Sequence, residues 1–470
     1  MFSGTGNGTQ LWIWILITTV MFNLSLSYDP SIVPTEVSLD FSGDENLASV
    51  LAHEKVVVCY VGTWAAYRKL DGKYDITNID PKLCTHIIYS FAGLDNQTYE
   101  MKPLDPWLDL YVEKNGGGND WYNKFTQLKQ KNHHLKVLLA IGGWNEGSIK
   151  YSEMAADPAK RQKFIASAVK MIKEHGFDGL DLDWEFPGSR GGKPEDKHTF
   201  TKLVEELRVP FDRHGLILTA ALGPAKSTAE QGYEVKPLAR LLDQIHLMCY
   251  DYHGSWDKKT SHNAPLYASF GEGSIEASVE YYLQKGVPAR KLVMGLPTYG
   301  RTFLLSDGTE DGPALGKAAG EVGFSGPYTN EPGFLGYNEI VKELLSNRGD
   351  WQTFWDDNAK VPFMRNGNKW LTFDNPESIR EKVEFAIKKN LRGAMFWSIE
   401  TDDFLGLSGV KYPLLKTVNF VLSQDTSTNE IPTDEPPTKP SSATSLLKMD
   451  TVFMAIASLI TVILKSVLYQ

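Results

Sequence analysis

Eight short runs of apolar, largely β-branched residues recur between His53 and Leu422, and this repetition constrains the fold more than any other feature of the chain. The runs cover residues 56–62, 86–93, 136–143, 179–186, 216–222, 244–251, 291–297 and 393–399. Runs that are apolar on both faces are typical of parallel strands covered by helices. Amphipathic stretches such as Pro158–His175 and Pro376–Asn390 lie between several of them. The pattern predicts an α/β fold, a (β/α)8 TIM barrel over residues 53–422, with a doubly wound open sheet as the alternative.

The spacing of the runs is uneven in one place. Nearly a hundred residues separate the seventh run from the eighth, and residues 303–373 are rich in glycine and aromatic side chains. A connection of this length far exceeds an ordinary loop. We therefore predict an inserted α+β subdomain between strand 7 and strand 8, which would form a wall beside the active-site face of a barrel.

The two ends of the chain carry segments that we exclude from the barrel. Residues 11–22 are uniformly uncharged and mostly apolar, and the small residues Ser25 and Ser27 follow. This predicts a signal peptide over residues 1–27, with a buried helix as the alternative. A Thr/Pro-rich acidic linker is predicted over residues 424–441. The tail at 442–470 contains fourteen uncharged residues, which is short for a membrane span, so we expect either a GPI-attachment signal or a tail anchor.

Charge and cysteine content narrow the functional classes. The formal net charge is −10 and no basic stretch stands out, so we expect no nucleic-acid partner. Three cysteines cannot build a disulfide-dense scaffold, but export would permit a Cys59–Cys84 bridge and leave Cys249 as a buried free thiol. Export would also make Asn96 a glycosylation site, because Thr98 completes its triplet. We expect an extracellular monomer, secreted or anchored at the cell surface, that meets the membrane only through the C-terminal tail.

The fourth run contains the strongest chemical signal. Side chains alternate along a strand, so Asp181, Asp183 and Glu185 should all point into the barrel and end at its C-terminal mouth. Three ionised and unpaired carboxylates cannot coexist there, so at least one must hold a proton and have a raised pKa. A raised pKa is what a general acid needs in glycoside hydrolysis. A solvated acidic edge strand and a divalent-metal site are the alternatives; the flanking residues are too apolar for the former, and we expect no metal and no cofactor.

Residues 178–185 match the DxxDxDxE signature of the family 18 glycoside hydrolases, the chitinases and chitinase-like lectins. Six further stretches resemble animal chitinases in order and spacing: residues 57–68, 83–93, 138–145, 248–256, 294–301 and 393–398. The resemblance extends over about 370 residues and includes the inserted segment around 326–328 and 355–362.

The resemblance implies a role for each carboxyl group. Glu185 resembles the proton donor to the glycosidic oxygen. Asp183 resembles the residue that turns toward that glutamate and binds the substrate's N-acetyl group, and Asp181 resembles its buried partner. In this family the substrate's own acetamide oxygen is the nucleophile, and the configuration at the cleaved carbon is retained. No second carboxylate nucleophile is then needed.

The resemblance also implies a sugar-binding cleft. Tyr250 resembles the tyrosine that hydrogen-bonds the acetamide, with Asp251 beside it, and Trp397 resembles the tryptophan under the sugar at the cleavage site. The other positions that match the cleft are Tyr60, Trp64, Phe91, Gly143, Trp144, Phe186, Met248, Trp256, Tyr299 and Arg301. The family commonly has Tyr where Phe186 stands, so one cleft hydroxyl is lost.

The implied function is an endo-acting chitinase that cuts β-1,4-linked N-acetylglucosamine polymers, with chitin or its oligosaccharides as partner. A catalytically silent chitinase-like lectin with the same cleft is the main alternative. Retention of Asp181, Asp183, Glu185 and Tyr250 favours the enzyme, because the lectins usually replace the acid or one aspartate. An endo-β-N-acetylglucosaminidase shares the signature but usually lacks the insertion.

Overall fold

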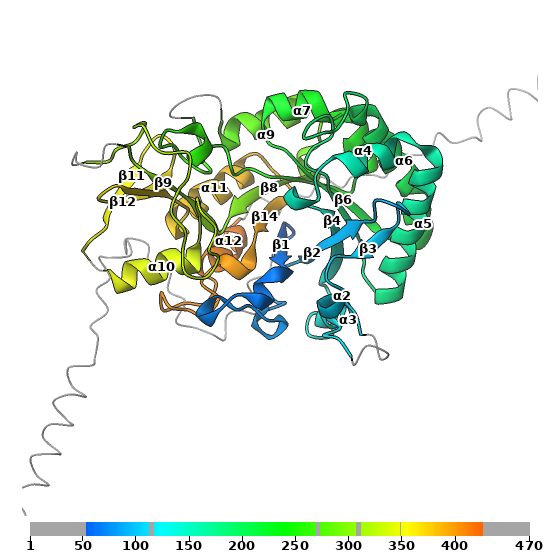
Figure 1. Cartoon of the computed structure of the whole chain (residues 1–470), viewed down its shortest axis with the longest axis horizontal. Coiled ribbons are helices and arrows are strands. Elements are labelled where there is room, and N and C mark those ends of the chain that lie inside the picture. Colours follow the sequence, from blue (N-terminus) through cyan, green and yellow to red (C-terminus); the bar gives the residue numbers. More distant parts are fainter. Residues whose placement is uncertain (1–52, 112–116, 269–272, 307–311, 348, 426–470) are drawn as a thin grey trace, which may run out of the picture. The chain divides into compact units, whose positions relative to one another are not determined.

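The eight apolar runs form the eight parallel strands of a closed barrel (Figure 1). The computed structural model describes residues 53–111, 117–268, 273–306, 312–347 and 349–425. The barrel strands are β1 (Val56–Gly62), β2 (His86–Leu94), β4 (Lys136–Gly142), β5 (Gly179–Asp183), β6 (Ile217–Leu222), β7 (Gln244–Leu247), β8 (Leu292–Pro297) and β14 (Gly393–Trp397). Each strand pairs with its neighbours in chain order, and β14 pairs with β1 to close the barrel. The predicted TIM barrel is therefore confirmed.

Helices surround the barrel and cover the outer face of its strands (Figure 1). They are α2 (Pro106–Asp109), α3 (Trp121–Gln127), α4 (Ile149–Ala156), α5 (Pro158–His175), α6 (Asp196–His214), α7 (Lys226–Gly232), α8 (Val235–Leu241), α9 (Ile275–Gln284), α11 (Pro376–Lys388) and α12 (Pro413–Ser423). The bounds of helix α5 match the sequence pattern because specific residues cap both of its ends. Asp157 caps its first turn by accepting from the amides of Ala159 and Lys160, and Gly176 ends it in the left-handed conformation.

A second sheet is inserted between β8 and β14. Its five antiparallel strands are β9 (Tyr299–Leu304), β10 (Phe334–Gly336), β11 (Gln352–Asp356), β12 (Val361–Asn366) and β13 (Lys369–Thr372), and helix α10 (Tyr337–Ser346) follows β10. The inserted α+β unit has a small core of its own around Phe303, Phe363 and Trp370. It begins at Tyr299 rather than at residue 303, because only Thr298 separates β9 from the end of β8.

Two barrel strands are shorter than their apolar runs. Strand β5 ends at Asp183 instead of 186, because the neighbouring strand β4 ends at Gly142. The amide of Gly143 then donates to the carbonyl of Asp183. Strand β7 ends at Leu247 instead of 251, because the backbone then turns tightly: the amide of Cys249 donates back to the carbonyl of Leu247 at 2.8 Å. In both cases the residues beyond the strand belong to the mouth of the barrel.

The cysteines are arranged as expected. Cys59 on β1 is bonded to Cys84 just before β2, with 6.1 Å between their Cα atoms. Cys249 is free and buried, and burial raises the pKa of its thiol to about 12.

The segments predicted at the two ends are outside the described residues. The signal peptide at 1–27, nearly all of the linker at 424–441 and the tail at 442–470 are among them. No helix within the described ranges is both long and apolar enough to cross a membrane. Asn96 is exposed in a turn that Asp95 stabilises by accepting from the amides of Gln97 and Thr98, and its glycosylation stays a prediction.

Candidate active site

Alternation along β5 separates its side chains into an outer and an inner set, as predicted. Leu180 and Leu182 belong to the large core between barrel and helices. Trp184, just past the strand, is in the same core and donates its indole N–H to the Ser148 hydroxyl. Asp181 faces the barrel interior, where it meets side chains from three other strands.

Asp181 is fully buried, accepts from side chains of β1 and β6, and lies next to a histidine of β7. The hydroxyl of Tyr60 donates to Oδ2 at 2.8 Å, and the hydroxyl of Thr219 donates to Oδ1 at 2.5 Å. Nδ1 of His246 lies 3.3 Å from Oδ1 and 2.7 Å from the Tyr60 hydroxyl oxygen. Each oxygen of this buried carboxyl group is therefore paired with a hydroxyl group.

Asp183 has a contrasting environment one step further along the strand. Its side chain is 4% exposed, and its Oδ1 has no hydrogen-bond partner among the described residues. Burial, and next the charges of Glu185 and Asp181, raise the pKa of Asp183 well above its usual range. The geometry therefore favours a protonated Asp183.

Glu185 lies half-buried at the mouth of the barrel, beyond the end of β5. Burial, and then the charge of Asp251, raise the pKa of Glu185 to about 7, while the charge of Arg190 opposes this shift. The guanidinium of Arg190 donates to the backbone carbonyls of Glu185 and Trp144, both at 2.9 Å. A carboxylic acid with a pKa near neutrality can donate a proton at the pH where proteins work.

The end of β7 and the start of β9 supply a polar cluster beside Glu185. Asp251 accepts from the hydroxyl of Tyr299 at 2.8 Å and forms an ion pair with Arg301 at 2.7 Å. The ring of Tyr250 packs edge-on against Tyr299, and its hydroxyl points at the sulfur of Met395, 3.8 Å away. Because thioether sulfur is a weak acceptor, this hydroxyl keeps most of its capacity to donate.

Aromatic rings from β1, the turn that follows it, β2 and β14 pack together at the same end of the barrel. The ring centroid of Trp397 lies 5.7 Å from that of Phe91, 5.8 Å from that of Tyr60 and 6.1 Å from that of Trp64. Gly143 approaches this group so closely that a Cβ there would lie 2.7 Å from the Phe91 ring, and its φ of +85° suits glycine.

Two further tryptophans stand at the rim, each beside an arginine. The guanidinium carbon of Arg190 lies 3.5 Å from the ring centroid of Trp144, and that of Arg301 lies 5.1 Å from the ring centroid of Trp256. Trp144 and Trp256 are more than half exposed. Each indole therefore has a guanidinium over its ring and leaves the rest of its surface exposed.

The remaining predicted residues are less exposed. Met248 is 8% exposed and packs with the barrel-interior cluster that also contains Tyr60, Tyr250 and Tyr299. Phe186 is partly buried against both this cluster and the outer core. The structure thus places the predicted residues at or just beyond the C-terminal ends of the barrel strands and in β9.

Sequence reasoning missed three residues of this site: Thr219, His246 and Arg190. His246 had a readable signal, because it precedes Met248 and Tyr250 at two-residue steps and so faces the same side of the run. Thr219 is one polar residue in an otherwise apolar strand, and Arg190 lies in a loop, where sequence spacing says little about contacts.

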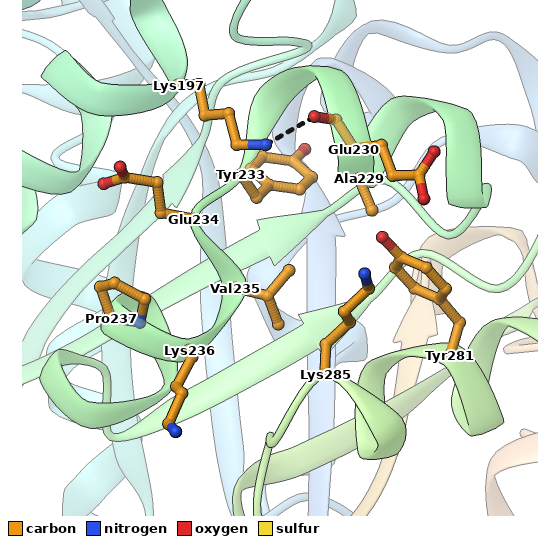
Figure 2. A pocket seen from close by; sticks show the side chains of 10 residues that line it. All are labelled: Lys197, Ala229, Glu230, Tyr233, Glu234, Val235, Lys236, Pro237, Tyr281 and Lys285. Carbon is orange, nitrogen blue, oxygen red and sulfur yellow. Dashed lines mark hydrogen bonds between the residues drawn. The ribbon is translucent and has the colours of Figure 1, made fainter.

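Outside this site, the described residues include a pocket but no cluster that could bind a metal ion. No group of three His, Cys, Asp or Glu residues that could hold a metal ion occurs in the part of the chain that the structure describes. A pocket of about 280 Å³ lies on the outer side of the barrel, among α6, α7, α8 and α9 (Figure 2). In it Lys197 donates to the backbone carbonyl of Glu230, and it contains none of the predicted site residues.

Comparison with known proteins agrees with this geometry. The family model described as glycosyl hydrolases family 18 matches residues 56–402. Probable chitinase 2 of Drosophila melanogaster is 43% identical over 444 residues, which cover 88% of this chain and 87% of the relative. The chain therefore belongs to family 18 of the glycosyl hydrolases.

Solved structures extend the comparison. The Group IV chitinase of Ostrinia furnacalis is similar with a TM-score of 0.75 and 46% identity, covering 79% of this chain and 100% of that one. Human YKL-39, described as a pseudo-chitinase with retained chitooligosaccharide binding, has a TM-score of 0.70 and 34% identity, covering 78% and 99%. The family thus contains both enzymes and binding proteins of the same fold.

Proposed function

We propose that this protein is an endo-acting chitinase that hydrolyses β-1,4 linkages between N-acetylglucosamine units with retention of configuration. The observation that carries the proposal is the pair formed by buried Asp183 and half-buried Glu185, whose pKa values are both raised, beside a group of aromatic side chains. Glu185 would protonate the glycosidic oxygen as the bond to the leaving sugar breaks. With a pKa of about 7 it holds the required proton over the slightly acidic to neutral range.

Asp183 and Tyr250 would act on the acetamide of the sugar at the cleavage site. The acetamide oxygen attacks the anomeric carbon, and positive charge develops on the amide as the ring forms. Asp183, whose Oδ1 is unpartnered in the described structure, would accept from the acetamide N–H, and the Tyr250 hydroxyl would donate to its oxygen. Once Glu185 has lost its proton, it can deprotonate the water that opens the ring, which restores the acid.

The aromatic groups would hold the polymer. Trp397 would lie under the sugar at the cleavage site, and the exposed rings of Trp64, Trp144 and Trp256 would stack on other sugars of the chain. Support for such a ligand comes from relatives, because the Ostrinia furnacalis Group IV chitinase was solved with allosamidin and YKL-39 with chitooligosaccharides.

The alternative is a chitinase-like lectin with the same cleft and no hydrolysis. YKL-39 shows that the fold supports binding without catalysis. The retained Glu185, with its raised pKa and its place beside Asp183, favours the enzyme.

One assay separates the two functions. The purified barrel is incubated with soluble chitin oligomers, and release of reducing ends is measured beside a Glu185→Gln variant. Activity that disappears in the variant, while oligomer binding persists in both proteins, supports the enzyme. Binding without reducing-end release by the unmodified protein would establish the lectin.

We also propose that the enzyme works outside the cell. The Cys59–Cys84 bond supports an oxidising compartment. A GPI anchor attached near Ser441 would retain the barrel at the cell surface. Phospholipase treatment of expressing cells should release soluble enzyme, whereas retention until detergent is added would indicate a membrane span. Secretion into the medium without treatment would contradict both anchors.

A further inference from the structure

A continuous chain of buried polar side chains leads from Asp181 away from the cleft toward the opposite end of the barrel. Nε2 of His246 lies 3.2 Å from Oε1 of Gln244, and Nε2 of Gln244 lies 3.2 Å from Nε2 of His86. Nδ1 of His86 lies 2.8 Å from the hydroxyl of Thr85. His246 is 1% exposed, Gln244 6% and His86 9%. Burying this many polar atoms is costly unless every contact pairs a donor with an acceptor.

The donor and acceptor assignments follow from the orientation of the Gln244 amide, whose NH₂ group faces His86 and whose carbonyl oxygen faces His246. The Thr85 hydroxyl donates to the carbonyl of Val57 and accepts from the amide of Val57. With the hydroxyl hydrogen directed to the Val57 carbonyl, the hydroxyl oxygen can also accept from Nδ1–H of His86. Nε2 of His86 is then an acceptor, which is satisfied by the amide group of Gln244. Burial, and next the charge of His246, lower the pKa of His86 to about 3, in agreement with a neutral ring.

The near end completes the assignment. With its NH₂ group turned to His86, Gln244 presents its carbonyl oxygen to Nε2 of His246, so Nε2 must donate. On the other side of the ring, the Tyr60 hydroxyl gives its hydrogen to Asp181 and can only accept from Nδ1 of His246. Both ring nitrogens of His246 are therefore donors.

We infer that His246 is a positioning residue that is present as an imidazolium ion, oriented by Gln244 and His86, and that it holds Asp181 in its ionised form. The inference rests on the proposed hydrolase function for its consequence, but not for its geometry. The charged and titratable groups around His246 are Asp181 on β5, Tyr60 on β1 and His86 on β2. The charges of Arg392 and Lys136 lie further off, beside His86.

The consequence concerns which aspartate holds the proton. An imidazolium 3.3 Å from Asp181 favours the carboxylate there, and the resulting negative charge helps to keep the proton on Asp183. Asp183 is then neutral until it turns toward the acetamide. Without the positive charge, the proton would be shared between the two aspartates, and fewer molecules would have the productive arrangement.

A neutron crystal structure of the complete barrel, at the pH where it is most active, tests the assignment directly. We expect deuterium on both Nδ1 and Nε2 of His246, and on Nδ1 alone of His86. A single deuterium on the His246 ring would overturn the inference. This readout does not require catalysis, so a protein that fails to hydrolyse chitin oligomers would refute the proposed function and leave the proton assignment standing.

A matched pair of variants tests the consequence. Gln244→Leu removes the acceptor from Nε2 of His246, whereas Val293→Ala alters the same barrel interior without touching a polar group. The acid limb of the pH profile of kcat/KM should move about one pH unit upward in Gln244→Leu, so that kcat/KM falls about tenfold one unit below the original limb. KM for oligomers should stay unchanged. An unmoved limb, or an equal shift in Val293→Ala, would contradict the positioning role.

Discussion

The floor and the rim of the site place their side chains in opposite environments, one buried and one exposed to solvent. The floor consists of Asp181 and its donors, all buried, and each polar contact there is made before any ligand arrives. The rim carries three tryptophans, Trp64, Trp144 and Trp256, that are 46%, 58% and 51% exposed. Large apolar surfaces left in water cost free energy that a bound ligand recovers.

The difference shows how the work of the site is divided. Charges in a barrel interior must be paired in the empty protein, because an unpaired buried charge is strongly destabilising. Stacking surfaces need no partner in the empty protein and add binding free energy when a sugar covers them. Glu185 lies between the two regions, half-buried, and combines a raised pKa with access to the ligand.

The largest expected effect is the loss of hydrolysis when Glu185, which lies between the floor and the rim, is replaced. Glu185→Gln keeps the shape of the cleft but removes the proton donor, so hydrolysis should fall by about 10²–10⁴-fold while oligomer binding stays near normal. Reducing-end release and calorimetry measure the two quantities. Glu195→Gln, at an exposed carboxylate, is the matched control. Retention of more than about a tenth of the activity in Glu185→Gln would contradict its role as the acid.

Stability should separate the floor from the rim. Asp181→Ala leaves the hydroxyl groups of Tyr60 and Thr219 without their acceptor, so the free energy of unfolding should fall by about 1–3 kcal/mol. Trp144→Ala, on the exposed rim, should change it by no more than about 0.5 kcal/mol. Denaturant titration measures both. Equal losses in the two variants would refute the division described above.

For ligand binding, we expect the aromatic side chains to matter more than the buried polar contacts. Trp397→Ala removes the ring that contacts Tyr60, Phe91 and Trp64 and should weaken binding of a chitin tetramer by about 1–3 kcal/mol. Calorimetry gives the dissociation constant. An unchanged constant would mean that Trp397 only fills space between its neighbours.

The pH dependence follows from the sign of the shift at Glu185. Its pKa is raised to about 7, and the protonated form is the active one, so activity is present below pH 7 and is lost as the pH rises through that value. Well above it, kcat/KM should fall about tenfold per pH unit. A profile that stays flat to pH 9 would exclude Glu185 as the group that titrates.

The smallest expected effect concerns Arg190. Its charge lowers the pKa of Glu185, so Arg190→Met should move the alkaline limb of the profile upward. Because Arg190 is exposed and its charge is screened by solvent, we expect a shift of less than about one pH unit. Arg190→Lys should keep the limb near its original position, and a downward shift in Arg190→Met would contradict the assigned sign.

The sequence by itself predicted the barrel, the insertion and the acidic strand, while the binding roles that the resemblance implies for the cleft residues stay predictions. The eight runs are apolar on both faces, as parallel strands buried on both sides are. The two-residue spacing of Asp181, Asp183 and Glu185 predicts that their side chains point the same way. The sequence did not determine where β5 and β7 end. A strand ends where its neighbour stops pairing with it, and that neighbour is distant along the chain.

Only the tertiary structure decided that the two aspartates of the strand have different environments. Asp181 and Asp183 are two residues apart on one strand and look alike in sequence. They differ because barrel closure brings Tyr60, Thr219 and His246 to Asp181, whereas none of the residues that the structure describes donates to Oδ1 of Asp183. These donors come from positions up to 121 residues away from Asp181 along the chain. Protonation depends on burial and on such distant partners, so it is a property of the folded barrel rather than of the motif.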